Sequence, residues 1–133
     1  MHIVIETTGT EPVLVDSSGW LEYITDDTKA ALFIPYFVAG NRALIVSPIV
    51  IYEVRKILLL RQSLRVADDF ASQVDRYPLV PVDARIALEA ASLSITHHLH
   101  FADALIYATA VIMHAELVTS DTHFNNLPGV TVI

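Results

Sequence analysis

Short apolar runs alternate with longer segments of helical periodicity along most of this chain. Five runs of two or three residues predict β-strands at 13–15, 44–46, 79–80, 117–119 and 130–132. Between them, apolar residues recur at three- and four-residue intervals, which predicts helices. Short, wholly apolar strands that alternate with helices are typical of a parallel sheet covered on both faces. We therefore expect an α/β fold: a three-layer α/β/α sandwich with roughly five parallel strands.

Several residues mark where the predicted helices begin and end. Ser47 and Pro48 favour a helix start, with Ser47 as the N-cap, and Asp83 is placed to cap a later helix. The segment 104–113 is apolar nearly all round, which predicts a helix buried on most sides. Pro35 is expected to break or kink the segment 33–37, and Gly40–Asn41 to end it.

The chain divides into a short lead and one domain. Residues 1–12 form an N-terminal extension, either an extra edge strand or an unstructured segment, because Gly9 and Pro12 separate it from the first confident strand. Residues 13–133 have the length of one ordinary domain.

Composition excludes several classes of protein. Apolar residues make up 53% and charged residues 17% of the chain, so disorder is excluded. There is no cysteine, which rules out disulfides and thiolate metal sites. The longest stretch without Asp, Glu, Lys or Arg has 13 residues, whereas a membrane-spanning helix needs about 20. The start lacks the features of a signal peptide, so we expect a cytoplasmic protein with no membrane association.

Charge and hydropathy constrain the partners. With 15 acidic and 8 basic residues, the formal net charge is −7, which argues against binding nucleic acid through a broad basic face. The mean hydropathy of +0.51 is high for so short a chain. We therefore expect a partner, or a second copy of the chain, to cover some apolar surface.

Four carboxylates stand where a site of a parallel sheet forms, beyond the carboxyl ends of the strands. Asp16 and Asp121 follow predicted strands, although either could simply cap a helix. Glu53 leaves its helix between Ile49 and Ile57, so it is either part of a site or paired with Lys56. Asp103 opens the apolar helix, where an anion is favoured in any case.

The distribution of cations strengthens the case for a site. Residues 86–133 contain no Lys or Arg, so Asp103 and Asp121 have no cation nearby in the sequence. Two carboxylates about 4 Å apart repel each other by roughly 4 kcal/mol, and a converging set stays ionised only around a cation. Oxygen ligands without thiolates indicate Mg²⁺ or Mn²⁺.

The order strand-Asp, helix-Glu, helix-Asp, strand-Asp resembles that of PIN-domain ribonucleases, and most of all the VapC-type toxins of toxin–antitoxin pairs. The matching segments are VLVDSSGWLEYI, LIVSPIVIYEVRKIL, HHLHFADALIYATA and ELVTSDTHFNNLPGVTVI, which together span residues 13 to 133. The lead of 12 residues is longer than usual for these toxins, and Pro35 interrupts a segment similar to their second helix.

The resemblance implies a metal-dependent endoribonuclease with Asp16, Glu53, Asp103 and Asp121 as its catalytic and metal-binding residues. Ser18 and Thr119 match the supporting hydroxyls of the family, although Ser18 could be a plain helix cap and Thr119 a plain strand residue. His123 is close enough to Asp121 in sequence to contact the substrate.

The implied partners are RNA, a cognate antitoxin and a second copy of the chain. An apolar groove near the first helices is expected to take an amphipathic antitoxin segment. The candidate anchors for that segment are Trp20, Tyr23, Phe33 and Phe37, although Trp20 and Tyr23 could equally pack on the core.

Other interpretations stay open at this point. A PIN-like nuclease could act in RNA processing or on DNA, and a PIN-like domain could be a non-catalytic interaction module. Phospho-receiver domains share the fold class, but they need a lysine after the last strands, and the only lysines are Lys29 and Lys56. His97 and His100 have the spacing of a helical zinc pair, if that segment is helical.

Overall fold

The computed structural model describes residues 9–38 and 42–133. Its sheet has four parallel strands in the order β2-β1-β3-β4: β1 (Val13–Val15), β2 (Leu44–Ile45), β3 (Glu116–Thr119) and β4 (Val130–Val132). The predicted strand at 79–80 is reduced to one parallel bridge between Leu79 and Val46, at the outer side of β2. The expected α/β fold with a parallel sheet is confirmed, with four strands and a bridge in place of about five strands.

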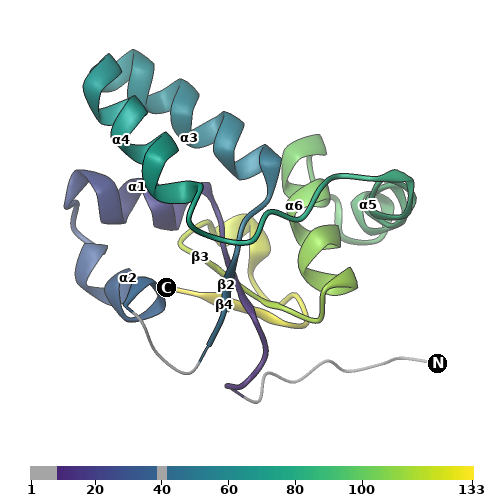
Figure 1. Ribbon diagram of the computed structural model, residues 1–133. Helices are drawn as coiled ribbons and strands as arrows, with labels where there is room; N and C mark the ends of the chain where they lie inside the picture. Colours follow the sequence, from purple (N-terminus) through teal and green to yellow (C-terminus); the bar gives the residue numbers. More distant parts are fainter. Residues whose placement is uncertain (1–8, 39–41) are drawn as a thin grey trace.

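Six α-helices and one 3₁₀-helix connect the strands. They are α1 (Ser17–Thr25), α2 (Ala30–Phe37), α3 (Pro48–Arg61), α4 (Leu64–Val74), α5 (Ala84–His97), α6 (Phe101–Ile112) and η1 (Thr122–Phe124). Figure 1 shows α1 and α2 on one side of the sheet and α5 and α6 on the other. Helix α3 follows β2 and contacts both α1 and α6, so it joins the two helical layers near the carboxyl ends of the strands.

The predicted helix starts are confirmed. The Ser47 hydroxyl accepts a hydrogen bond from the Ile49 N–H, with Pro48 as the first helical residue, and the Asp83 carboxylate accepts one from the Ile86 N–H. Helix α6 is buried as expected, since all seven residues from 104 to 110 are buried. This helix forms the centre of its layer.

The expected break at Pro35 does not occur, because α2 continues through this residue to Phe37. Pro35 is the sixth of eight residues, so the missing N–H removes one hydrogen bond from a helix that ends two residues later. The C-cap of the helix is Val38, whose backbone is extended. Gly40 and Asn41, where the helix was expected to end, lie outside the described residues. Most of the N-terminal extension, residues 1–8, also lies outside them.

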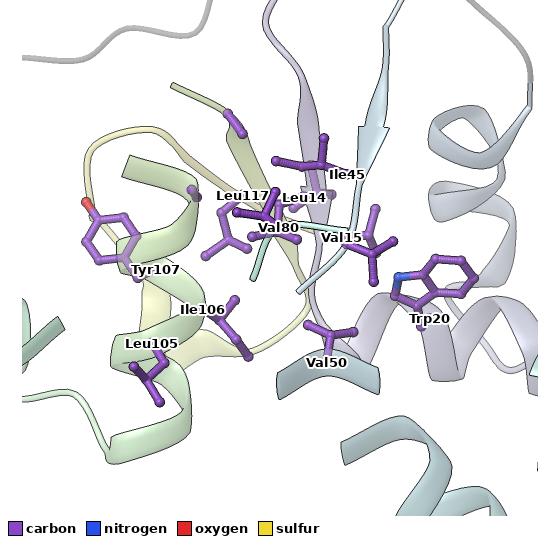
Figure 2. Close-up of a cluster of buried hydrophobic side chains, with 14 of the residues drawn as sticks. Leu14, Val15, Trp20, Ile45, Val50, Val80, Leu105, Ile106, Tyr107 and Leu117 are labelled. Atoms are coloured by element: carbon purple, nitrogen blue, oxygen red, sulfur yellow. The ribbon is translucent and has the colours of Figure 1, made fainter. Parts of the chain in front are cut away.

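The core fills both faces of the sheet. Figure 2 shows Trp20 on one side of the strands and Ile106 and Tyr107 on the other. Trp20 is fully buried, and its ring meets those of Phe37, Phe70 and Tyr77 edge to face at centroid distances of 4.6, 5.4 and 5.8 Å. Helix α1 approaches the sheet closely at Gly19, where a Cβ would lie 2.4 Å from the Val15 Cγ1.

Burial of these aromatic rings corrects the expected antitoxin anchors. Trp20 and Phe33 are both 0% exposed, so neither is available to a partner, and Trp20 belongs to the core. Tyr23 and Phe37 are half-buried and stack on each other with centroids 4.1 Å apart. Only this second pair remains at the surface.

None of the helices in the described ranges is long and apolar enough to cross a lipid bilayer.

Candidate active site

The sheet topology places Asp16 and Asp121 at one edge. Strands β1 and β3 are adjacent and parallel, with Val15 opposite Val118. Asp16 directly follows β1, and Asp121 comes two residues after the end of β3. Each carboxylate also caps the helix that follows: Asp16 accepts a hydrogen bond from the Gly19 N–H, and Asp121 accepts one from the His123 N–H.

Asp16 is the most buried of the four carboxylates, with 5% of its surface exposed. Its Oδ1 accepts a hydrogen bond from the Ser18 hydroxyl at 2.5 Å, and its Oδ2 accepts one from the Thr119 hydroxyl at 2.6 Å. Burial raises the pKa of Asp16 to about 6, although these hydrogen bonds favour the charged form; the charge of Asp121 raises it further. Ser18 lies inside α1 and supports Asp16, so it is not the cap of that helix.

Two hydroxyls join the ends of β1 and β3. Thr119, which is fully buried, donates to Asp16 and accepts a hydrogen bond from the Asp121 N–H at 2.9 Å. The Ser18 hydroxyl accepts one from the Ser120 N–H at 3.0 Å. The backbone that carries Asp121 is therefore fixed relative to Asp16.

Asp103 lies in the first turn of α6 and faces Asp121 and His123. Ligand atoms of these three residues all lie within 4.8 Å of one another. Burial raises the pKa of Asp103, and the charges of Asp121 and Glu53 raise it further, whereas His123 and His100 lower it. The His123 Nδ1 lies 2.9 Å from the Asp121 Oδ1.

Glu53 reaches the same edge from α3. The Ser17 hydroxyl donates to its Oε1 at 2.6 Å, and its charge acts on Asp103. The alternative pairing with Lys56 does not form among the described residues; the Lys56 ammonium instead lies over the Tyr52 ring, 5.8 Å from its centroid. All four acidic residues singled out from the sequence thus lie around one end of the sheet.

The model of the PIN domain matches residues 13–130 of this sequence. The chain belongs to the PIN domain family. The phospho-receiver interpretation is therefore wrong. No curated protein sequence matches this PIN domain at a significant level.

Solved structures share the fold of this PIN domain over most of their length. A chain of a toxin–antitoxin complex from Klebsiella pneumoniae has a TM-score of 0.77 and 21% identity, with 90% of this chain and 96% of that chain covered. For VapBC2 from Rickettsia felis, bound to a DNA fragment from its promoter, the values are 0.72 and 16%, with 91% and 96% covered. For the sarcin–ricin loop cleaving toxin VapC20 from Mycobacterium tuberculosis they are 0.67 and 18%, with 78% and 85% covered.

Two residues of the PIN domain site were missed or only partly recognised in the sequence. Ser17, which holds Glu53, is 36 residues away from it, and nothing in a single sequence links them. His123 was expected to be either a contact to substrate or phosphate or a plain surface residue, yet it stands with Asp103 and Asp121 in the one group of potential metal ligands found in the described ranges. The spacing Asp-x-His was the available clue.

The zinc interpretation has no support in this PIN domain. Residue His97 ends α5 and His98 adopts a left-handed conformation after it, so His97 and His100 do not share a helix. The His97 ring lies edge to face with Tyr107 at 5.9 Å, and the His100 ring lies 6.3 Å from that of His123.

The raised pKa of Asp16 predicts an unusual pH dependence of stability for the metal-free PIN domain. Between pH 3.8 and about 6 the unfolded chain has lost the Asp16 proton while the folded chain keeps it, so this residue's contribution to the free energy of unfolding falls as the pH rises through that range. Relative to the variant Asp16→Asn, the wild type should lose roughly 2–3 kcal/mol between pH 4 and pH 7. Urea unfolding of both proteins in EDTA at several pH values measures this difference. If the free energies of unfolding of the two proteins changed with pH in the same way, burial would not raise the pKa of Asp16 as described.

Proposed function

We propose that this PIN domain is a metal-dependent endoribonuclease that hydrolyses RNA phosphodiester bonds, and that it is the toxin of a toxin–antitoxin pair acting in the cytoplasm. The observation that carries the proposal is the mutual placement of four carboxylates at one sheet edge. Asp121 acts electrostatically on both Asp16 and Asp103, and Glu53 acts on Asp103. Repelling carboxylates held together by the fold are typical of a cation site.

The residues present fit Mg²⁺ or Mn²⁺, with Asp16, Glu53, Asp103 and Asp121 as the proposed metal set. Asp103 and Asp121 offer oxygen atoms close to each other and to a nitrogen of His123. The Asp16 Oδ2 accepts one hydrogen bond, from Thr119, so it keeps a lone pair for a cation. Such a metal, when bound, lowers the pKa of a water and offsets the charge that develops on the phosphate oxygens.

Glu53 is placed to handle the proton of the attacking water. Its Oε1 is held by Ser17, while its Oε2 accepts no hydrogen bond from the described residues. We assign proton acceptance to the Glu53 Oε2, and to Asp16, Asp103 and Asp121 the holding of a cation, which when bound would orient the scissile phosphate. Ser18 and Thr119 are supporting residues, because their hydroxyls fix the Asp16 carboxylate.

The toxin assignment draws support from the shared fold. Two of the similar structures are toxin–antitoxin assemblies, and a third is an RNA-cleaving toxin. We propose that the antitoxin lays an apolar segment near Tyr23 and Phe37 and extends an arginine into the carboxylates. Exposed apolar side chains on α3, with Tyr52 65% and Leu60 74% exposed, suit a second copy of the chain, and we propose a homodimer.

Metal removal tests the nuclease. The purified chain is expected to cleave RNA in Mg²⁺ or Mn²⁺, to lose all cleavage in excess EDTA, and to regain it when Mn²⁺ is restored, because the carboxylates alone repel a phosphate. Gel analysis of labelled RNA and of single-stranded DNA of the same sequence measures this loss. Full cleavage in EDTA overturns the metal proposal, and cleavage of DNA alone replaces the RNA assignment.

Expression tests the toxin. The chain produced alone is expected to arrest growth, and co-production of the neighbouring gene product is expected to relieve the arrest and to co-purify with it. A harmless chain that binds no neighbouring product overturns the toxin assignment while leaving the nuclease chemistry in place. An inert, partner-binding chain instead supports the non-catalytic interaction module.

A further inference from the structure

A cavity of about 460 Å³ opens beside the carboxylates, between α1, α3 and the end of β3. Ser18 and Ser120 line it, and both also belong to the hydrogen-bond network of Asp16. The cavity is therefore continuous with the site. Its volume lies within the range of about 300–1,000 Å³ that is common for small-ligand pockets.

The cavity extends along one face of α3. Ile57 and Arg61 follow Glu53 at four-residue intervals, so the three side chains share that face, and Arg61 lies about 12 Å beyond Glu53 along the helix axis. Arg61 is the single Lys or Arg among the residues that line the cavity. Its guanidinium is therefore available to an anionic group of a ligand in the cavity.

The opposite wall, from α1, combines an apolar surface with an immobilised carboxylate. Leu21 of this wall and Ile57 of the facing helix α3 supply apolar contact area. Glu22 is half-buried, and its Oε2 accepts a hydrogen bond from the Lys29 N–H at 2.9 Å, which fixes the carboxylate at the cavity wall. An apolar surface with a fixed pair of acceptor oxygens suits a flat ring that carries adjacent N–H donors.

We propose that this cavity binds the base of a nucleotide beside the scissile phosphate and selects guanine, with Glu22 reading the base and Arg61 contacting the backbone. The inference rests on the proposed ribonuclease function and names the sequence preference of that site. Single-stranded RNA is read mainly through the Watson–Crick edges of splayed bases. Among the four bases, guanine alone presents two adjacent donors there, its N1–H and N2 amino group, which match a carboxylate in two parallel hydrogen bonds.

A basic peptide is the other occupant to consider, since Glu22 and Asp27 both line the cavity. A peptide cation bound at Glu22 would share the cavity with the Arg61 guanidinium, and the two positive charges would repel each other. A nucleotide instead brings N–H donors for the carboxylate and a negative charge for Arg61. The apolar wall also matches a base better than a solvated ammonium group. The observations therefore favour the nucleotide.

The test compares Glu22→Gln and Arg61→Gln with the matched controls Asp69→Asn and Arg65→Gln, which change exposed residues of α4 that do not line the cavity. Each variant is made in the full-length active chain and in the Asp103→Asn background. The active proteins cleave a randomised RNA, and the cut sites are sequenced. The Asp103→Asn proteins are titrated by fluorescence anisotropy with uridine-rich oligonucleotides carrying a single G, A or C.

Guanine is expected at one position next to the cut. Glu22→Gln should lower affinity for the guanine oligonucleotide about tenfold or more and leave the others unchanged, because an amide keeps one acceptor and loses the other. Arg61→Gln should weaken all the oligonucleotides alike and reduce the slope of log affinity against log salt by about one. Glu22→Gln still offers an acceptor to the Lys29 N–H, so the fold is retained.

Three outcomes overturn the inference. The first is that the protein binds all the oligonucleotides with equal affinity, and the second is that Glu22→Gln and Asp69→Asn change the affinities equally. The third is that an arginine-rich peptide binds in a way that depends on Glu22 while RNA binding does not. Absence of cleavage by the wild type with Mn²⁺ present contradicts the proposed function instead, and the anisotropy titration still decides whether the cavity reads guanine.

Discussion

Replacing Asp103 by Asn should lower the rate of RNA cleavage by about a hundredfold or more while leaving the melting temperature unchanged or higher. In the proposed metal site this carboxylate would supply part of the charge that holds the cation, and losing one such electrostatic contact commonly lowers rates by about 10²–10³. Stability should not fall, because Asp121 and Glu53 both act to raise the pKa of Asp103, so its charge is repelled in the folded chain. Cleavage kinetics and thermal unfolding of the same preparations measure both effects.

The matched control for this variant is Glu89→Gln, which removes a carboxylate of α5 that lies outside the site. It should keep full activity. A second variant, Asp121→Asn, should lose activity to a similar extent as Asp103→Asn. Cleavage by Asp103→Asn at the wild-type rate would falsify the role given to this carboxylate, and a drop of many degrees in its melting temperature would mean that Asp103 stabilises the fold.

Replacing Arg42 by Met should destabilise the domain by about 1–3 kcal/mol, the range for leaving a buried polar group without its hydrogen-bond partner, because the pair is only partly buried. The Arg42 guanidinium lies 2.6 Å from the Glu116 Oε1 at the amino end of β3, far from the catalytic edge. Glu116 is 5% exposed, and the Thr131 hydroxyl also donates to it. Without Arg42, Glu116 would be a buried carboxylate that has lost its cation, and burying an unpaired charge is costly.

The double variant Arg42→Met/Glu116→Gln separates this cause from simple loss of packing. If the unpaired charge is responsible, the double variant should recover most of the lost free energy of unfolding. Urea unfolding of the wild type and of both variants measures this recovery. Equal losses in the single and double variants would show that packing by the arginine stem dominates.

The layered fold and the edge that carries the carboxylates follow from local patterns in the sequence. Strands buried on both faces are continuous apolar runs, and the residues that follow them must lie at one edge, as Asp16 and Asp121 do. The strand at 79–80 was expected at full length because its residues are apolar, but a ladder needs a partner along its length, and only Leu79 has one. Such pairing is not encoded within a short segment.

The wrong anchors and the missed contacts share one cause, which is sequence separation. The sequence left open whether Trp20 anchors a partner or packs on the core, because Phe70 and Tyr77, which cover it, lie 50 and 57 residues further along the chain. The same holds for Ser17, whose role depends on how α1 and α3 cross. Helix α2 shows a different limit: loss of a single hydrogen bond at Pro35 is small beside the burial of Phe33.

The burial of residues 104–110 in α6 has a consequence for how the site responds to substrate. Seven consecutive buried residues are not exposed by local fraying, so this segment of the helix opens only when the domain around it unfolds. Asp103 directly precedes the buried segment, so the core anchors the turn that carries it. Little conformational entropy is lost at this carboxylate when a ligand binds, so the site is preorganised by the core itself.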